Sequence, residues 1–388
     1  MTQRFYILIL IAFVFLFSNC SAQEQIKENR RSEKELAEFS LILENLSNDF
    51  DYRVRRGVAC NPNSSVEILK KLSNDDYEDV RAYVAFNPNC TIELLEKLSE
   101  DENANVRSYV GLNANSPVEL LSKLSNDANA YVRRYVAFNE NCPSEILAKL
   151  TLDNIDYVQK NAIQNANCPI ELLKKFAKDE NYEIRRCVAE NINCPINLLE
   201  ELAQDEDEIT CTNAISNPNF PVELLEKFAK DKDEFIRSSV AINANCPVNI
   251  LEKLSKDTDE TVRENVAYNE SCPPNILEKL SKDEDYIRKY VAANPICPAD
   301  ILEKLSKDKV VLENVITNPN CPPKILEKFS KETENEETED VQMRCLVASN
   351  INCSIEILNK LSKDTNRRVR EEVAFNSLCQ AKKIKMLY

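Results

Sequence analysis

Asparagine recurs along this chain at an almost fixed interval, and this period constrains the fold more than any other feature. The first nine occurrences are 26 residues apart, and the later steps are 25, 24, 32 and 26 residues. The thirteen positions are Asn61, Asn87, Asn113, Asn139, Asn165, Asn191, Asn217, Asn243, Asn269, Asn294, Asn318, Asn350 and Asn376. A period in this range is typical of one small supersecondary unit stacked many times. We therefore expect a repeat protein, whose long surface serves a partner that the repeat does not identify.

Each repeat carries two apolar stripes with helical spacing. In the repeat from Asp75 to Leu98, one stripe falls at positions i, i+4 and i+5 and the other at i, i+1 and i+4, so each lies on one side of a short helix. The stripes are Val80, Val84 and Ala85, and Leu94, Leu95 and Leu98. The leucines never alternate with polar residues as in a β-strand, which disfavours the β-horseshoe form of leucine-rich repeat. The sequence thus predicts an all-α solenoid of about thirteen two-helix repeats, each about 26 residues long.

Proline and asparagine mark the ends of the expected helices. Nine prolines stand four residues after the repeated asparagine, where proline suits the first position of the second helix. They are Pro117, Pro143, Pro169, Pro195, Pro221, Pro247, Pro273, Pro298 and Pro322. We expect the asparagine to close the first helix in the left-handed conformation, because the chain has only two glycines for this task. This interpretation makes the asparagines helix stops; a row of asparagines that binds a partner is the alternative.

Aspartate and arginine form a second ladder, in which the members of each pair are six positions apart. The pairs are Asp49/Arg55, Asp75/Arg81, Asp101/Arg107, Asp127/Arg133, Asp179/Arg185, Asp231/Arg237, Asp257/Arg263 and Asp364/Arg370. An aspartate before a helix can cap it, and an arginine one turn inside can bridge to that aspartate or to the one in the adjacent repeat. Gln159, Cys211 and Leu312 replace the arginine in three repeats. Because each arginine accompanies an acid, structural bridging is favoured over anion binding.

The repeated run resembles a known family of repeats. Val132–Leu150, which reads VRRYVAFNENCPSEILAKL, is similar to the leucine-rich repeat variant family, and the Asp-x5-Arg spacing also resembles HEAT repeats. The similarity covers residues 49–376. It implies a right-handed α-solenoid of paired short helices, of the HEAT- or armadillo-like kind. Some relatives carry a cysteine-rich iron–sulfur segment ahead of the repeats, but residues 21–59 contain no cysteine, so that feature is not expected here.

Residues 1–19 have the composition of an export signal. Arg4 precedes an apolar run of about 12 residues from Tyr6 to Phe17, which suits a signal peptide and is well short of the ~20 residues that span a bilayer. Cys20 then stands where lipoprotein processing would make it the lipidated first residue. Cleavage before Gln23 would instead release a soluble secreted protein, and an uncleaved anchor or a cytosolic protein is the third alternative. We expect a membrane-anchored lipoprotein of the bacterial cell envelope, or a secreted protein.

The rest of the chain divides around the repeats. Residues 20–31 read as a polar tether, residues 32–48 as an N-terminal capping half-repeat, and residues 377–388 as a C-terminal cap, because exposed end repeats need polar covers. The repeats at 49–376 contain an acidic insert at 332–340. We interpret this insert as a solvated loop; a site for a cation or a basic partner is the alternative.

Composition disfavours several classes of function. The net charge is −16, whereas binding to nucleic acid requires a basic stripe. Histidine is absent from all 388 residues, which removes the usual general base and the commonest zinc ligand. With only Gly57 and Gly111, a glycine-rich phosphate loop is not possible. We therefore expect no enzyme, no catalytic residue and no cofactor.

Ten of the fifteen cysteines stand three residues after the repeated asparagine. Ser64, Ser116 and Phe220 fill the same position in other repeats, as suits a packing site rather than a ligand. Equivalent positions in stacked helices lie ~8–10 Å apart, beyond the ~7 Å over which a disulfide can join two Cα atoms. Packed free thiols are favoured; an occasional disulfide and a metal site are the alternatives.

Aromatic residues supply the candidate binding surface. Tyr83, Tyr109 and Tyr135 stand four residues before the asparagine in three consecutive repeats, and Phe86 and Phe138 stand one residue before it, with Arg134 beside them. This aromatic strip is of the kind favoured at interfaces, and packing between repeats is the alternative. The sequence favours a non-enzymatic scaffold of the bacterial cell envelope that binds an unidentified protein partner. A metal- or iron–sulfur-binding redox protein and a secreted soluble interaction protein are the alternatives.

Overall fold

The computed structural model describes residues 33–331 and 338–376, and these residues form an all-α solenoid, as predicted. Each repeat pairs a first helix with a second helix. The first helices are α3 (Tyr52–Cys60), α5 (Glu78–Phe86), α7 (Ala104–Leu112), α9 (Ala130–Phe138), α11 (Asp156–Gln164), α13 (Tyr182–Glu190), α15 (Glu208–Ser216), α17 (Glu234–Ile242), α19 (Glu260–Tyr268), α21 (Asp285–Ala293), α23 (Leu312–Thr317), α25 (Thr338–Ser349) and α27 (Arg367–Phe375). The second helices are α4 (Val66–Leu72), α6 (Ile92–Leu98), α8 (Val118–Leu124), α10 (Ser144–Leu150), α12 (Ile170–Phe176), α14 (Ile196–Leu202), α16 (Val222–Phe228), α18 (Val248–Leu254), α20 (Pro274–Leu280), α22 (Ala299–Leu305), α24 (Pro323–Phe329) and α26 (Ile355–Leu361), and α2 (Glu33–Leu46) precedes them all.

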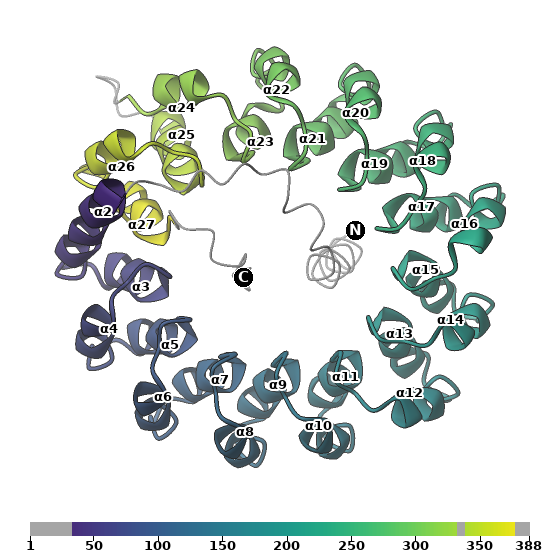
Figure 1. Cartoon of the computed structure of the whole chain (residues 1–388), viewed down its shortest axis with the longest axis horizontal. Coiled ribbons are helices and arrows are strands. Elements are labelled where there is room, and N and C mark those ends of the chain that lie inside the picture. Colours follow the sequence, from purple (N-terminus) through teal and green to yellow (C-terminus); the bar gives the residue numbers. More distant parts are fainter. Residues whose placement is uncertain (1–32, 332–337, 377–388) are drawn as a thin grey trace. The chain divides into compact units, whose positions relative to one another are not determined.

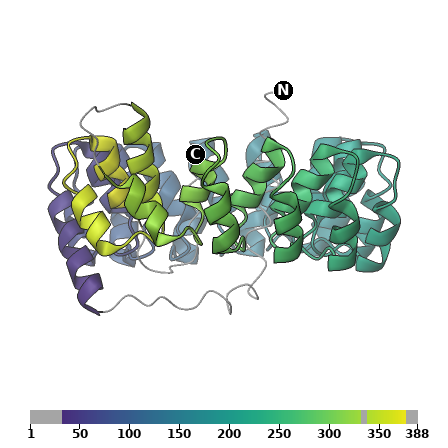
Figure 2. The same ribbon diagram turned by 90° about the horizontal axis from the view of Figure 1, so that it is seen from above.

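The repeats belong to two compact units. Unit 1 contains residues 140–297, and unit 2 contains residues 33–139 together with 298–376. Within each unit, the first helices of neighbouring repeats pack side by side, as α17 does with α19 in unit 1 and α5 with α7 in unit 2. Figure 1 shows the resulting two layers in each unit, one of first helices and one of second helices. Figure 2, at right angles, shows that the helices run across the direction in which the repeats stack.

The two apolar stripes of each repeat form the core between these layers. Val80 and Val84 of α5 and Leu95 of α6 are completely buried. Each such side chain stabilises the fold by about 1.5–3 kcal/mol relative to an exposed one. The same positions are filled in repeat after repeat, so each repeat depends on its neighbours for burial.

The asparagines end the first helices, but not in the left-handed conformation. Asn87 has φ −62° and ψ 132°, and no non-glycine residue in the described ranges has a positive φ. Its buried amide donates to the carbonyls of Ala59 and Asn61 in the preceding repeat at 2.7 and 2.8 Å, and its Oδ1 accepts the Asn89 N–H. The expected conformation is therefore wrong. Asparagine is required because its side chain satisfies the helix end of the adjacent repeat, which glycine cannot do.

The prolines precede the second helices rather than beginning them. Pro117 is the N-cap of α8, with φ −61° and ψ 154°, and α8 begins at Val118. The Pro117 carbonyl accepts the Leu121 N–H at 3.0 Å, so the residue contributes to the helix although it has no N–H of its own. The predicted helix start is thus one residue early. Where proline is absent, a hydroxyl caps the helix instead, as at Ser65, Thr91 and Ser354.

The arginines bridge in both of the ways that the sequence allowed. Arg81 forms a bidentate pair with Asp101 at 2.8 and 3.1 Å, and its third nitrogen donates to the Asp75 carbonyl at 2.9 Å. The same bidentate pairing joins Arg55–Asp75, Arg107–Asp127, Arg185–Asp205, Arg237–Asp257, Arg263–Asp283 and Arg344–Asp364. Arg81 therefore connects the loop before its helix to the end of the following second helix, and Arg55, Arg107, Arg185, Arg237 and Arg263 do the same.

The last described repeat packs against the first within unit 2 (Figure 1). The Asn61 amide donates to the carbonyls of Ala374 and Asn376 at 2.7 and 2.8 Å, which is the arrangement that Asn87 makes with α3. Gly57 permits the close approach, because a Cβ at this residue would lie 2.8 Å from the Cβ of Ala374. We call this packing of α27 on α3, together with the adjoining α2, the terminal junction.

Helix α2 acts as a second helix for the last repeat. Elsewhere each arginine of the ladder binds the aspartate 20 residues further along, as Arg81 binds Asp101. Arg370 of α27 instead binds Asp49, which follows α2, with 3.1 Å between Nε and Oδ2. Helix α2 also lies against α26. Helix α2 thus packs on α26, and Asp49 after it supplies the partner of Arg370. The role of residues 32–48 as a capping half-repeat stays a prediction.

Candidate functional site

The aromatic strip lies on α5, α7 and α9 in unit 2. The rings of Tyr83 and Tyr109 are 5.3 Å apart between centroids, and those of Tyr109 and Tyr135 are 5.7 Å apart. Phe86 meets Tyr109 edge-on at 5.6 Å. The structure therefore brings these four predicted residues into one cluster that crosses three repeats.

Exposure differs along the strip. The three tyrosines are half-buried, and burial is the largest cause of the raised pKa of Tyr109, followed by its two tyrosine neighbours. Arg134 and Phe138 are exposed, and 40% of Phe138 faces solvent. The rings thus pack between repeats, as one interpretation of the sequence expected. Arg134 and Phe138, on α9, are the most accessible members of the strip, as a binding surface needs.

One aromatic residue of this surface was missed by the sequence analysis. Phe375 of α27 lies 6.4 Å from Tyr83, and the guanidinium of Arg56 lies 5.7 Å from the Tyr83 ring and 5.6 Å from the Phe375 ring. Phe375 stands one residue before Asn376, which is the register of Phe86, so a signal was available. This signal could not place Phe375 beside the strip without knowledge of the terminal junction, because about 290 residues separate Phe86 from Phe375 in sequence.

The same register in unit 1 carries polar side chains. Glu190 accepts hydrogen bonds from the amides of Gln164 and Asn213, the latter at 2.7 Å. Burial raises the pKa of Glu190 to about 6, because the two amides and the more distant Arg186 only partly offset the loss of solvent. Arg186 itself is engaged by Asp207 at 2.7 and 2.8 Å. At these positions before the repeated asparagine, the side chains are thus mainly aromatic in α5, α7 and α9 and polar in α11, α13 and α15.

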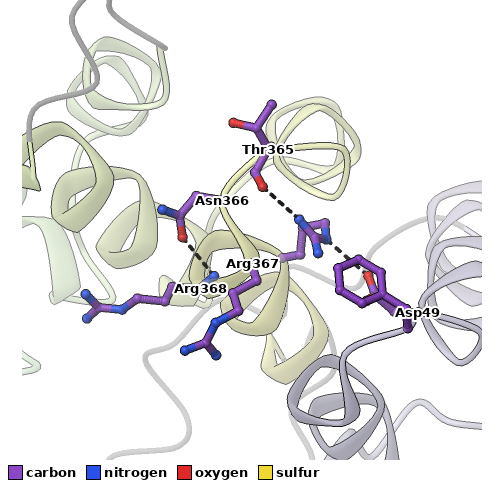
Figure 3. A pocket seen from close by; sticks show the side chains of 7 residues that line it. Asp49, Thr365, Asn366, Arg367 and Arg368 are labelled. Carbon is purple, nitrogen blue, oxygen red and sulfur yellow. Dashed lines mark hydrogen bonds and ion pairs between the residues drawn. The ribbon is translucent and has the colours of Figure 1, made fainter.

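A pocket of about 600 Å³ opens at the terminal junction. It is lined by Asp49, Phe50, Thr365, Asn366, Arg367, Arg368 and Arg370. Figure 3 shows Arg367 and Arg368 extending from the start of α27 away from Asp49. The Arg370 Nε donates to the Asp49 carboxylate at 3.1 Å. Phe50 is 87% exposed, and its ring lies 5.9 Å from the Arg370 guanidinium. The sequence analysis did not identify this site, because its lining comes from two distant segments.

The cysteines are packed into the core. Every cysteine in the described part of the chain is a free thiol, and those three residues after the asparagine are buried. Burial raises the pKa of the Cys90 and Cys142 thiols to about 12, which disfavours the thiolate that metal binding and disulfide exchange require. Among the described residues, no group of three or more acidic or cysteine side chains is placed to hold a metal ion.

Several predicted features lie outside the described residues. They are the export signal, Cys20, the polar tether, residues 332–337 of the acidic insert and the C-terminal cap at 377–388. The remaining residues of the insert, 338–340, belong to the first turn of α25. None of the helices in the described ranges combines the length and the apolar character needed to cross a bilayer.

Comparisons with known proteins found likenesses among solved structures alone. Family models and curated proteins gave no match. Among solved structures, a leucine-rich repeat variant with a novel repetitive motif is 24% identical, with a TM-score of 0.34 over 57% of this chain and 88% of the other. An engineered protein is 17% identical (TM-score 0.27; 87% of this chain, 98% of the other), and Kap121p bound to Pho4p is 13% identical (TM-score 0.27; 95% and 48%). These values describe similarity to the other chains alone. The assignment of this chain as a solenoid rests on the helices described above.

Proposed function

We propose that this chain is a non-enzymatic scaffold that binds a protein partner through the aromatic strip. The observation that supports this proposal is the register of Tyr83, Tyr109 and Tyr135, whose rings form one surface across three repeats. A repeat array holds such a surface rigidly, so little conformational entropy is lost on binding. Tyrosine combines a large apolar ring with a polar edge, and this combination dominates binding energy at many interfaces.

The α9 end is the part of the strip that offers most to a partner. Phe138 provides exposed apolar area, and the exposed Arg134 can pair with a carboxylate. The half-buried tyrosines of the strip pack against one another and extend this surface across three repeats. We expect a partner that places an apolar side chain against Phe138 and an acidic group near Arg134.

Affinity capture with paired variants tests this role. The mature protein, the Phe138→Ser/Arg134→Ala variant and a Val118→Ser control would each be immobilised and exposed to an envelope extract. Val118 is a matched control because it is apolar and 53% exposed but lies on the second helix α8. We expect one protein to be retained by the wild type and the control and depleted at least tenfold, about 1.4 kcal/mol, by the strip variant. Equal capture by all three would refute the role of the strip.

We further propose export and attachment to the bacterial cell envelope through Cys20. The support is the apolar run from Tyr6 to Phe17 and the cysteine that follows it. A lipidated amino terminus with two or more acyl chains would hold the protein stably at the membrane. Mass spectrometry of the mature protein tests the proposal, and Cys20→Ala should leave the protein unprocessed or mislocalised. An unmodified amino terminus at Gln23 would show that the protein is released instead.

A further inference from the structure

The pocket at the terminal junction concentrates positive charge in a strongly acidic chain. Arg367, Arg368 and Arg370 line it, against one lining carboxylate, that of Asp49. The Asp49 carboxylate is engaged by Arg370. Arg368 makes no side-chain hydrogen bond and no ion pair within the described residues, and it is exposed. The side chain of Arg367 is 42% exposed and has only long contacts, at 3.8 Å to Asp51 and 3.9 Å to Glu371.

The placement of these two arginines contradicts the electrostatic preference of their helix. They occupy the first turn of α27, where the positive end of the helix dipole favours acidic residues. Several other first helices follow that preference, with Glu78 and Asp79 in α5 and Glu260 in α19, whereas α3 carries one arginine, Arg53, in its first turn. Two adjacent arginines make α27 the larger departure from the local rule, and such departures are typical of functional sites. A bound anion would neutralise both guanidiniums and the helix end together.

We propose that this pocket binds a carboxylate of an acidic peptide segment through Arg367 and Arg368, while Phe50 contacts an apolar side chain beside it. The planar guanidiniums match the two oxygens of a carboxylate. The nearby negative charges of Asp51 and Glu371 favour a singly charged carboxylate over a dianionic phosphate. The 87% exposure of Phe50 at the rim supplies the apolar contact. This site shares no residue with the aromatic strip, so either can fail without the other.

Fluorescence anisotropy with the full chain tests the proposal. The probe is a labelled peptide, Glu-Glu-Leu-Glu-Glu, and its neutral counterpart is Gln-Gln-Leu-Gln-Gln. We expect the glutamate peptide to bind at least tenfold more tightly than the glutamine peptide, and its binding to weaken as salt rises. The Arg367→Gln/Arg368→Gln variant should lose at least tenfold in affinity, and Phe50→Ser should lose a smaller factor.

Arg53→Gln is the matched control. Arg53 occupies the second position of α3, as Arg368 does in α27, and its side chain is 40% exposed, but it does not line the pocket. It should change affinity less than twofold. If the double variant fails to fold by circular dichroism, Arg368→Gln alone provides the test, because that side chain makes no hydrogen bond or ion pair within the described residues that the substitution would remove. Undiminished binding by the arginine variants, or equal binding of the neutral peptide, would overturn the proposal. Displacement of the peptide by low-millimolar inorganic phosphate would overturn the carboxylate assignment.

Discussion

At the scale of single residues, the repeated asparagine acts through its side chain rather than its backbone. Asn113 donates to the carbonyls of Ala85 and Asn87 at 2.6 and 3.0 Å and accepts the Asn115 N–H. Asn113→Ala leaves these buried groups unpaired and should cost about 2–4 kcal/mol. Asn113→Gly should cost at least as much, whereas a left-handed helix stop would tolerate glycine. Urea denaturation measures both, with exposed Asn115→Ala as the milder control; a neutral glycine variant would contradict the side-chain role.

Glu190 is a second residue whose surroundings determine its effect on the stability of the fold. Because burial raises its folded pKa from an unfolded value near 4.5 to about 6, ionisation opposes folding as pH rises through this window. Glu190→Gln should therefore raise stability at pH 7 by about 1–2 kcal/mol, and this gain should vanish below pH 4.5, where the wild type is also neutral. Urea denaturation at several pH values tests this. A gain that does not depend on pH would indicate a packing effect instead.

At the scale of elements, the approach of α3 to α27 depends on Gly57. Alanine is the better helix former by about 1 kcal/mol, so an uncrowded Gly57→Ala would stabilise the protein. In the terminal junction, however, the new Cβ would meet Ala374 Cβ at 2.8 Å and the Glu371 carbonyl at 3.2 Å. We expect a net loss of about 1–3 kcal/mol and faster amide exchange in both helices. Gly111→Ala is the control, because a new Cβ there would lie 3.0 Å from a methyl of Val136 that can move. An equal or greater loss of stability in Gly111→Ala would contradict the view that crowding in the terminal junction makes Gly57→Ala destabilising.

At the scale of the whole molecule, unit 2 is assembled from both ends of the described chain. Its two segments are joined by the Asn61 and Arg370 contacts and by the packing of α27 on α3. Fragments 33–152 and 281–376, each cut at a boundary between repeats, should therefore bind each other without the intervening repeats. We expect a 1:1 complex at micromolar concentration by analytical ultracentrifugation, weakened at least tenfold by Gly57→Ala, which corresponds to about 1.4 kcal/mol. Absence of association at tens of micromolar would show that the junction cannot hold the segments together.

Local patterns were sufficient to predict the repeats. The spacing of Val80, Val84 and Leu95 identified the helices and their buried faces, because burial of a helical stripe depends on positions only a few residues apart. The Asp–Arg bridges and the tyrosine cluster were predictable for the same reason, since equivalent positions of stacked repeats become neighbours. The backbone conformation of the repeated asparagine was not predictable, because the carbonyls to which its side chain donates belong to another repeat.

The terminal junction depends on packing between segments that no local pattern relates. The sequence period specifies how one repeat contacts the next. Small differences in the angle between neighbouring repeats add up along the chain, and their sum decides which distant repeats meet. The pairing of Arg370 with Asp49, the contact of Tyr83 with Phe375 and the arginine pocket all follow from that meeting. The chain thus encodes its helices and repeat contacts in short-range spacing, whereas the arginine pocket arises where the first and last described repeats pack together.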